Sequence, residues 1–230
     1  MRSSRTTERS SNTCLKFTYA VLMTGGFQPS LLDTAAEAGL RELGASVHRT
    51  ELGHGAWVDL LPGWVIGADA LFERLLETVP WRAERRQMYD NVVAVPRLLS
   101  FYAADEALPD PVLEQARHAL DGYYGPELGE PLCTTGLCLY RDGRDSVAWH
   151  GDTSGRRVRT TIVAIVSLGN PRALLLRPRG GGSALRHDVG HGDLLVMGGT
   201  CQRTWQHAIP KTARAAGPRI SVQFRPRDIR

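Results

Sequence analysis

The sequence has no long apolar run and little cysteine. No segment approaches the roughly 18–20 consecutive apolar residues that a helix needs to cross a bilayer, which excludes an integral helical membrane protein. The four cysteines (Cys14, Cys133, Cys138 and Cys201) include no CxxC pair, so they predict neither a disulfide framework nor a thiolate zinc site. These absences lead us to expect a soluble protein of the reducing cytoplasm.

Glutamate is absent from the C-terminal part of the chain, although the overall composition is ordinary. Residues 140–230 contain 16 Lys and Arg against 6 Asp, a net charge of +10, whereas the whole chain carries +4. This basic half predicts a polyanionic partner or an anionic substrate. The alternative is that arginine simply covers a solvated surface. The content of 42% hydrophobic and 23% charged residues excludes disorder across the whole chain.

The chain of 230 residues fits one domain with a short N-terminal appendage. Residues 1–26 are expected to form a disordered tail. In the region 27–125, apolar periodicity predicts a helix over 67–79, and 31–43 is a second candidate. Asp110 and Pro111 then provide an N-cap and a first-turn proline for a third helix that reaches about residue 120.

The region 126–230 has a different residue pattern, in which short β-rich runs are separated by Gly, Pro and Asp turns. The runs are Leu137–Arg141, Ser146–His150, Thr160–Ser167, Ala173–Arg177, Asp193–Met197, Thr204–Ala208 and Arg219–Arg225. Strands at this spacing are typical of a sandwich or barrel. We therefore predict an α+β domain in which N-terminal helices support a double-sheet jelly-roll core (a double-stranded β-helix).

Three residues of the β-rich region have the types and spacing of a metal site. His150 and Asp152 are two residues apart, so an extended backbone would point both side chains to the same face. His207 lies 57 residues later in another predicted strand. Two histidines and one carboxylate form the facial triad that leaves open positions on Fe(II). The alternative is a surface histidine and a turn aspartate, because so short a motif also arises by chance.

The last predicted strand adds a second indication. Arg219, Ser221, Gln223 and Arg225 alternate with apolar residues, so they share one face. Two arginines facing the inside of a small β-roll would need an anionic partner. A dicarboxylate such as 2-oxoglutarate would satisfy them through charge-assisted hydrogen bonds. The alternative is that this face is exposed to solvent.

These motifs resemble the AlkB family of Fe(II)- and 2-oxoglutarate-dependent dioxygenases, which demethylate nucleic acid bases. The resemblance extends over roughly residues 57–225. The matching segments are Val79–Trp81, Pro96–Leu98 with Tyr102, Leu139–Asp152, Gly192–Gly199, Trp205–His207, Pro210–Lys211 and Pro218–Arg225. It implies that residues 27–125 include a nucleotide-recognition region and that 126–230 form the catalytic core of the same domain.

The resemblance also implies site residues. His150, Asp152 and His207 would be the catalytic iron ligands. The residues that would bind 2-oxoglutarate are Tyr140, Arg219, Ser221 and Arg225. The residues that would contact the flipped nucleotide are Trp81, Arg97, Tyr102, Ser154 and Met197. Independently of the resemblance, Arg156, Arg157 and Arg159 directly follow the HxD turn, which would place them at the rim of the iron pocket in contact with phosphates; the alternative is a solvated loop.

Three positions depart from the family pattern. Cys138 and Ser221 stand where asparagines usually help to bind 2-oxoglutarate, which weakens the polar network but leaves both arginine charges. Ser154 stands where an acidic residue often contacts the base, which puts the base preference in doubt.

The function implied is oxidative dealkylation of N-alkylated bases in DNA, or in RNA. The reaction would use Fe(II) and O₂, convert 2-oxoglutarate to succinate and CO₂, and release formaldehyde. We expect a cytoplasmic monomer that binds alkylated nucleic acid and no membrane. Two alternatives stay open: a 2-oxoglutarate oxygenase acting on a protein or a small metabolite, and a non-enzymatic β-roll binding module.

Overall fold

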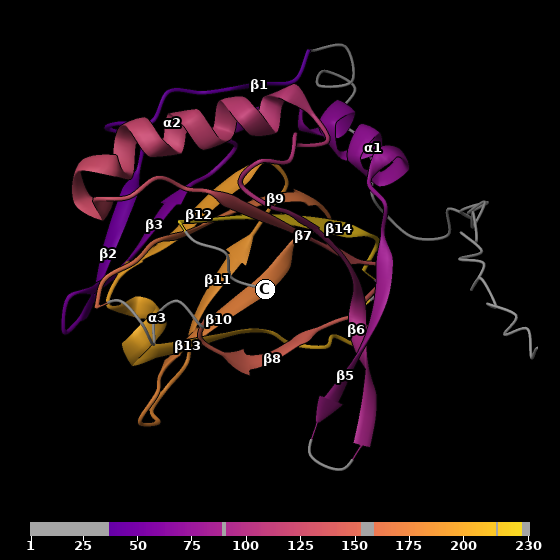
Figure 1. Cartoon of the computed structure of the whole chain (residues 1–230). Coiled ribbons are helices and arrows are strands. Elements are labelled where there is room, and N and C mark those ends of the chain that lie inside the picture. Colours follow the sequence, from indigo (N-terminus) through magenta and orange to yellow (C-terminus); the bar gives the residue numbers. More distant parts are fainter. Residues whose placement is uncertain (1–36, 89–90, 153–158, 215, 227–230) are drawn as a thin grey trace, which may run out of the picture.

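The computed structural model describes residues 37–88, 91–152, 159–214 and 216–226. Two antiparallel sheets face each other, and two helices cover the outer face of the larger one (Figure 1). The larger sheet has the order β2-β3-β12-β9-β14-β7-β6-β5, and the smaller one β11-β10-β13-β8. The predicted jelly-roll core is confirmed. None of the helices in the described ranges is long and apolar enough to cross a membrane.

The strands of the larger sheet are β2 (His48–Gly53), β3 (Ala56–Leu61), β5 (Arg82–Met88), β6 (Asn91–Tyr102), β7 (Thr134–Tyr140), β9 (Val163–Gly169), β12 (Asp193–Gly199) and β14 (Arg219–Arg225). Those of the smaller sheet are β8 (Val147–His150), β10 (Arg172–Pro178), β11 (Leu185–Val189) and β13 (Trp205–Ile209). A separate pair joins β1 (Gly39–Leu40) to β4 (Val65–Ile66). The helices are α1 (Ala68–Thr78), α2 (Pro111–Leu128) and α3 (Cys201–Thr204).

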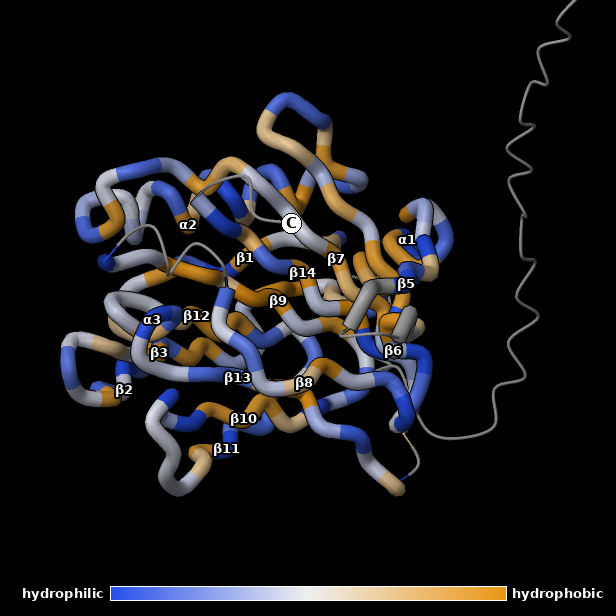
Figure 2. The backbone as a smooth tube through the Cα atoms, turned by 60° about the horizontal axis from the view of Figure 1, so that its bottom comes forward, coloured by the Kyte–Doolittle hydropathy of each residue, from blue (hydrophilic) through white to orange (hydrophobic). Residues whose placement is uncertain are grey.

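The two faces of the larger sheet line two separate hydrophobic cores. Leu137 and Leu139 of β7 belong to the cluster that includes buried residues of α1 and α2. Cys138 and Tyr140, which alternate with them, belong to the cluster between the two sheets. Strand β9 is buried along its whole length and is hydrophobic along most of it (Figure 2). Alternation along the other central strands therefore decides which side chains enter the space between the sheets.

The same alternation places the polar row of β14 inside the molecule. Ile220, Val222 and Phe224 pack in the cluster beneath the helices. Arg219, Ser221 and Gln223 are nevertheless buried, because their face of β14 points toward the smaller sheet. The alternative of a solvent-exposed polar face is excluded for these three residues.

Two of the three predicted helices are present. Asp110 caps α2 as predicted, accepting a hydrogen bond from the backbone N–H of Val112 at 2.9 Å. The helix continues past Gly122 to Leu128, because Tyr124 is buried and donates to Asp59 of β3 at 3.0 Å. A tertiary contact therefore outweighs the local helix-breaking tendency of glycine.

The helix predicted for 31–43 is wrong over its described part. Residues 31–36 lie outside the described ranges, and 37–43 contain the short strand β1. Gly39 and Leu40 pair with Ile66 and Val65, and the backbone N–H of Arg41 donates to a carbonyl at 2.8 Å. Pairing with a distant strand overrides the apolar periodicity here.

The region 27–125 also contains strands that the sequence did not reveal. Strand β3 pairs with both β2 and β12, and most of its residues are buried, so it shows no alternation. Strands β5 and β6 form a hairpin at the opposite edge of the larger sheet. The N-terminal region is thus part of the main sheet as well as a support for it.

Candidate metal and co-substrate site

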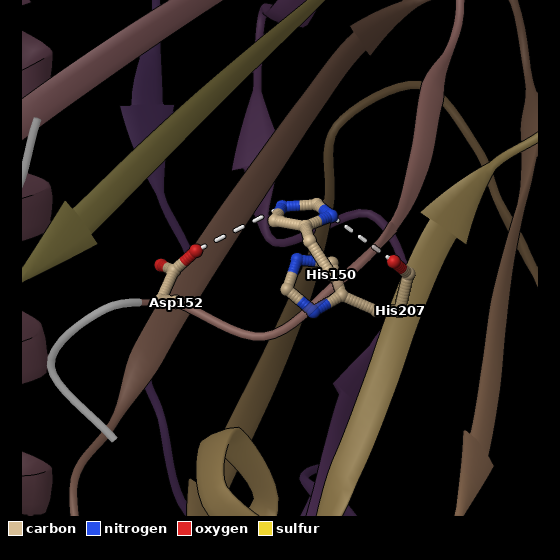
Figure 3. Close-up of side chains that lie close together, drawn as sticks. All are labelled: His150, Asp152 and His207. Carbon is tan, nitrogen blue, oxygen red and sulfur yellow. Dashed lines mark hydrogen bonds and ion pairs between the residues drawn. The ribbon is translucent and has the colours of Figure 1, made fainter. Parts of the chain in front are cut away.

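Two histidines face each other across neighbouring strands of the smaller sheet. His150 ends β8 and pairs in register with His207 of β13, and their ring centroids are 4.1 Å apart. Asp152 follows two residues after His150, and the possible ligand atoms of all three residues lie within 4.8 Å of one another (Figure 3). The structure therefore brings the three predicted ligands to one point.

The orientation of His150 suits metal binding. Its Nδ1 lies 3.1 Å from the carbonyl of His207 (Figure 3). The same nitrogen lies 2.9 Å from the carbonyl of Ala148, and both contacts favour a proton on it. The other nitrogen, Nε2, lies 3.8 Å from Oδ1 of Asp152. A backbone carbonyl that fixes the ring in this way is the usual companion of a metal-binding histidine.

The protonation states fit a divalent cation. Burial, together with the nearby His150, lowers the pKa of His207 to about 3, and burial also lowers the pKa of His150. Burial alone would raise the pKa of Asp152, but Arg225 and the histidines outweigh it and hold this pKa at about 2. At neutral pH the site therefore offers two neutral imidazoles and one carboxylate, the forms that bind metal ions.

Arg219 has the environment expected for a carboxylate-binding residue. Its side chain is only 1% exposed, and its Nε donates to Oγ of Ser167 at 2.9 Å. Neither Nη1 nor Nη2 has a hydrogen-bond partner among the described residues. An unpaired guanidinium in a protein interior is costly, and a carboxylate can satisfy both nitrogens at once.

Tyr140 lies beside this guanidinium. It pairs in register with Arg219, whose Cζ is 5.3 Å from the centre of the phenol ring. Burial raises the pKa of Tyr140 to about 12, so the phenol is protonated and can donate a hydrogen bond. Both groups therefore offer hydrogen-bond donors to an anion in the same buried place.

Gln223 links two of the three positions that depart from the family pattern. Its Nε2 donates to Oγ of Ser221 at 2.7 Å, and its Oε1 lies 3.6 Å from the thiol sulfur of Cys138. The sequence placed Gln223 on the correct face of the strand but assigned it no role. Its alternation with Ser221 was the available signal.

A cavity of about 750 Å³ opens onto the metal-binding point. Residues of the hairpin, of β14 and of the segment around Asp152 line it, among them Arg97, Tyr102, His150, Asp152, Gln223 and Arg225. The hairpin also contributes Arg82 and Glu84, which the sequence did not single out because β5 was not recognised. A cavity of this size is typical of small-molecule sites.

Among the predicted nucleotide contacts that the structure describes, Arg97 and Tyr102 line the cavity. Arg97 donates from Nη1 to the carbonyl of Ser146 at 3.1 Å, which ties the hairpin to the residue just before the strand that carries His150. The structure therefore brings these two side chains to the same cavity as the metal-binding point.

The structure does not bring Trp81 or Met197 to this cavity wall. Trp81 packs against the core beneath the helices, and its indole N–H donates to the carbonyl of Leu76 at 3.2 Å. Met197 is fully buried between the sheets, where Nε2 of Gln202 lies 3.7 Å from its sulfur. Both side chains therefore pack against hydrophobic clusters.

Some predicted contacts cannot be placed. Ser154, Arg156 and Arg157 lie outside the described residues. Arg159 is described and exposed.

Comparisons with known proteins agree with this geometry. Residues 127–225 match the family model of the 2OG-Fe(II) oxygenase superfamily. The chain is 32% identical over 190 residues to the bovine "Alpha-ketoglutarate-dependent dioxygenase alkB homolog 3" and 31% identical to its human counterpart. Each of these alignments covers 73% of this chain, which spans 65% of the length of the relative.

A plant relative is more distant. The "DNA oxidative demethylase ALKBH2" of Arabidopsis thaliana is 26% identical over 218 residues, covering 76% of this chain and 68% of the plant protein. Among solved structures, OsALKBH1 superposes with a TM-score of 0.52 at 15% identity, covering 78% of this chain and all of that one. A Trichoplax adhaerens prolyl hydroxylase in complex with a peptide fragment gives 0.53 at 12% identity, covering 74% and 83%. At these identities the superpositions support the shared fold.

Proposed function

We propose that the chain is a member of the AlkB family of 2OG-Fe(II) oxygenases and that it oxidatively removes N-alkyl groups from nucleic acid bases. The observation that carries the proposal is the buried guanidinium of Arg219, whose two terminal nitrogens have no partner among the described residues. It lies on the same face of β14 as Arg225, which contacts Asp152 of the triad. The proposed metal ligands and the proposed carboxylate-binding residue, Arg219, therefore lie in the same part of the protein interior.

His150, Asp152 and His207 would hold Fe(II), and Arg219 with Tyr140 would hold a carboxylate of 2-oxoglutarate. When bound, iron, 2-oxoglutarate and O₂ supply the oxidising power that hydroxylates an N-alkyl carbon, which then leaves as an aldehyde. The protein keeps His150 and His207 neutral, fixes the Asp152 carboxylate through Arg225 and excludes water from the Arg219 end.

The cavity above the metal point supports a base-sized substrate. Its wall combines Tyr102, which can stack on a base, with the charged side chains of Arg97 and Glu84. A base inside a duplex cannot reach a buried metal point, so it must be flipped or come from a single strand. The net charge of +10 in residues 140–230 would attract such a polyanion.

Mass spectrometry of methylated oligonucleotides tests this function. Single-stranded DNA and RNA oligonucleotides with one N-methylated base are incubated with the full chain, Fe(II), ascorbate and 2-oxoglutarate. The proposal expects loss of the methyl group and release of formaldehyde from at least one of the two kinds of oligonucleotide. The D152A variant is the control, because it lacks one of the three proposed metal ligands and should be inactive.

The same assay separates the alternatives. Demethylation of a free nucleoside as fast as of an oligonucleotide would favour a metabolite oxygenase. Absence of any iron-dependent 2-oxoglutarate consumption, with or without oligonucleotide, would favour a non-enzymatic binding module.

A further inference from the structure

Gln202 contacts the backbone of the proposed carboxylate ligand. Its side-chain Oε1 accepts a hydrogen bond from the backbone N–H of Asp152 at 2.9 Å, and this contact is buried. Gln202 itself is only 2% exposed and belongs to α3, the single-turn helix between β12 and β13. Residues 50 positions apart in the sequence are therefore joined immediately behind the metal point.

The helix that carries Gln202 is anchored on two sides. Oγ1 of Thr200, the residue before the helix, donates to the carbonyl of His54 at 2.9 Å. From the other side, Arg179 donates from Nε to the carbonyl of Arg203 at 3.1 Å. These contacts tie α3 both to the turn between β2 and β3 and to the end of β10. The oxygen of Gln202 is therefore presented from a fixed support.

The segment that carries Asp152 packs against α3 without a side chain between them. A Cβ atom on Gly151 would lie 2.7 Å from the carbonyl oxygen of Gln202 and 2.6 Å from Nη2 of Arg179. Contacts that short are not tolerated, so only glycine allows this approach. The close packing brings the N–H of Asp152 within reach of the Gln202 side chain.

Asp152 is consequently held at two points. Gln202 holds its backbone N–H, and Arg225 donates to its Oδ2 at 2.5 Å. The remaining oxygen, Oδ1, faces Nε2 of His150 at 3.8 Å. We propose that Gln202 is a positioning residue, which keeps the Asp152 carboxylate oriented for a divalent cation. This inference rests on the proposed function, because it assumes that the triad binds metal.

The physical reason is the cost of a buried, unpaired N–H. Without an acceptor on residue 202, the peptide of Asp152 would rotate to find another partner. The side chain of aspartate is short, so rotation of its peptide displaces the carboxylate from the histidines. Partners that orient metal ligands in this way typically change metal affinity by about 10–100-fold when they are removed.

The test measures Mn²⁺ binding to the metal-free full chain by calorimetry. Q202M keeps the length of the side chain but removes the acceptor, and we expect it to bind Mn²⁺ about 10–100-fold more weakly than wild type. Q202E keeps an acceptor oxygen and should bind within a few-fold of wild type. Q206M is the matched control, because Gln206 lies beside His207 in the sequence but bonds Arg177. It should bind like wild type.

Two further measurements make the outcome decisive. Melting curves with and without Mn²⁺ show whether each variant folds and how far the metal stabilises it. A structural defect alone would lower the melting temperature of metal-free Q202M and leave the Mn²⁺-induced rise unchanged, which would overturn the inference. If Q202M does not fold, Q202N replaces it, since its amide is one methylene too short to reach the N–H.

The Mn²⁺ titrations distinguish failure of the proposed metal site from failure of the role proposed for Gln202. If the wild-type chain does not bind Mn²⁺, the proposed function and this inference fall together. If wild type binds, D152A does not, and Q202M equals wild type, the metal site stands and Gln202 has no positioning role.

Discussion

Arg225, the last residue of β14, donates from Nε to Oδ2 of Asp152 at 2.5 Å. One strand therefore contacts the proposed metal ligand at one end and carries Arg219 at the other, whose two terminal nitrogens have no partner among the described residues. Strand β14 thus links the proposed carboxylate-binding residue to a proposed metal ligand that lies outside this strand.

Replacing Arg225 should weaken metal binding. R225A removes the donor that orients Asp152, so the carboxylate can rotate away from the histidines. We expect Mn²⁺ affinity to fall about 10–100-fold in a calorimetric titration. R177A is the control, because Arg177 lies over Trp149 and bonds Gln206 rather than the triad. Equal Mn²⁺ affinity of R225A and wild type would show that Asp152 needs no such support.

Replacing Arg219 should weaken 2-oxoglutarate binding. R219A leaves a carboxylate without its buried partner, at a cost of roughly 2–5 kcal/mol, or about 30-fold to several thousand-fold in affinity. R219K should recover only part of this, because an ammonium lacks the planar fork of a guanidinium. The measurement is 2-oxoglutarate binding to the Mn²⁺-loaded chain. An unchanged affinity in R219A would place the carboxylate elsewhere, with Arg225 the first candidate.

Replacing Arg219 by an apolar residue should stabilise the ligand-free protein. The Arg219 guanidinium is buried with two nitrogens unpaired among the described residues, which is unfavourable until an anion binds. R219M should therefore raise the free energy of unfolding of the ligand-free chain by roughly 1–4 kcal/mol. Urea unfolding measures this change. A destabilised R219M would mean that the guanidinium is already satisfied in the ligand-free protein.

Tyr140 should make the protein sensitive to alkaline pH. Burial raises its pKa to about 12, above the value of about 10 for the unfolded chain. Between these values only the unfolded state has lost the proton, so stability falls as pH rises. The loss approaches about 1.4 kcal/mol per pH unit. In urea unfolding from pH 9 to 12, Y140F should lose less stability than wild type, and parallel curves would contradict a buried, protonated Tyr140.

Much of the site could be predicted because its residues follow strand periodicity. The spacing of His150 and Asp152 and the alternation from Arg219 to Arg225 are local patterns, and strand geometry turns each into a shared face. Capping chemistry likewise fixed the start of α2 at Asp110. The alternation alone does not decide whether the face that carries Arg219 is buried. The expected role of Arg219 in anion binding was the reason to predict burial.

Other features depend on long-range packing and could not be predicted. Gln202 meets Asp152 through a short helix whose position depends on β2, β3 and β10. Trp81 belongs to a motif that matched the family, yet its indole faces the carbonyl of Leu76 and the core. Strand β3 could not be predicted, because burial on both faces removes the alternation of polar and apolar residues that marks a strand.

The stoichiometry of the coupled reaction shows whether the proposed iron site drives demethylation. Succinate and demethylated oligonucleotide are quantified in the same sample, for wild type and for H207A, which lacks a buried proposed ligand. We predict about one succinate for each methyl group removed at saturating oligonucleotide, and neither product from H207A with added Fe(II). Demethylation by H207A at the wild-type rate, or succinate formation that is never accompanied by demethylation of any methylated oligonucleotide, would contradict the account.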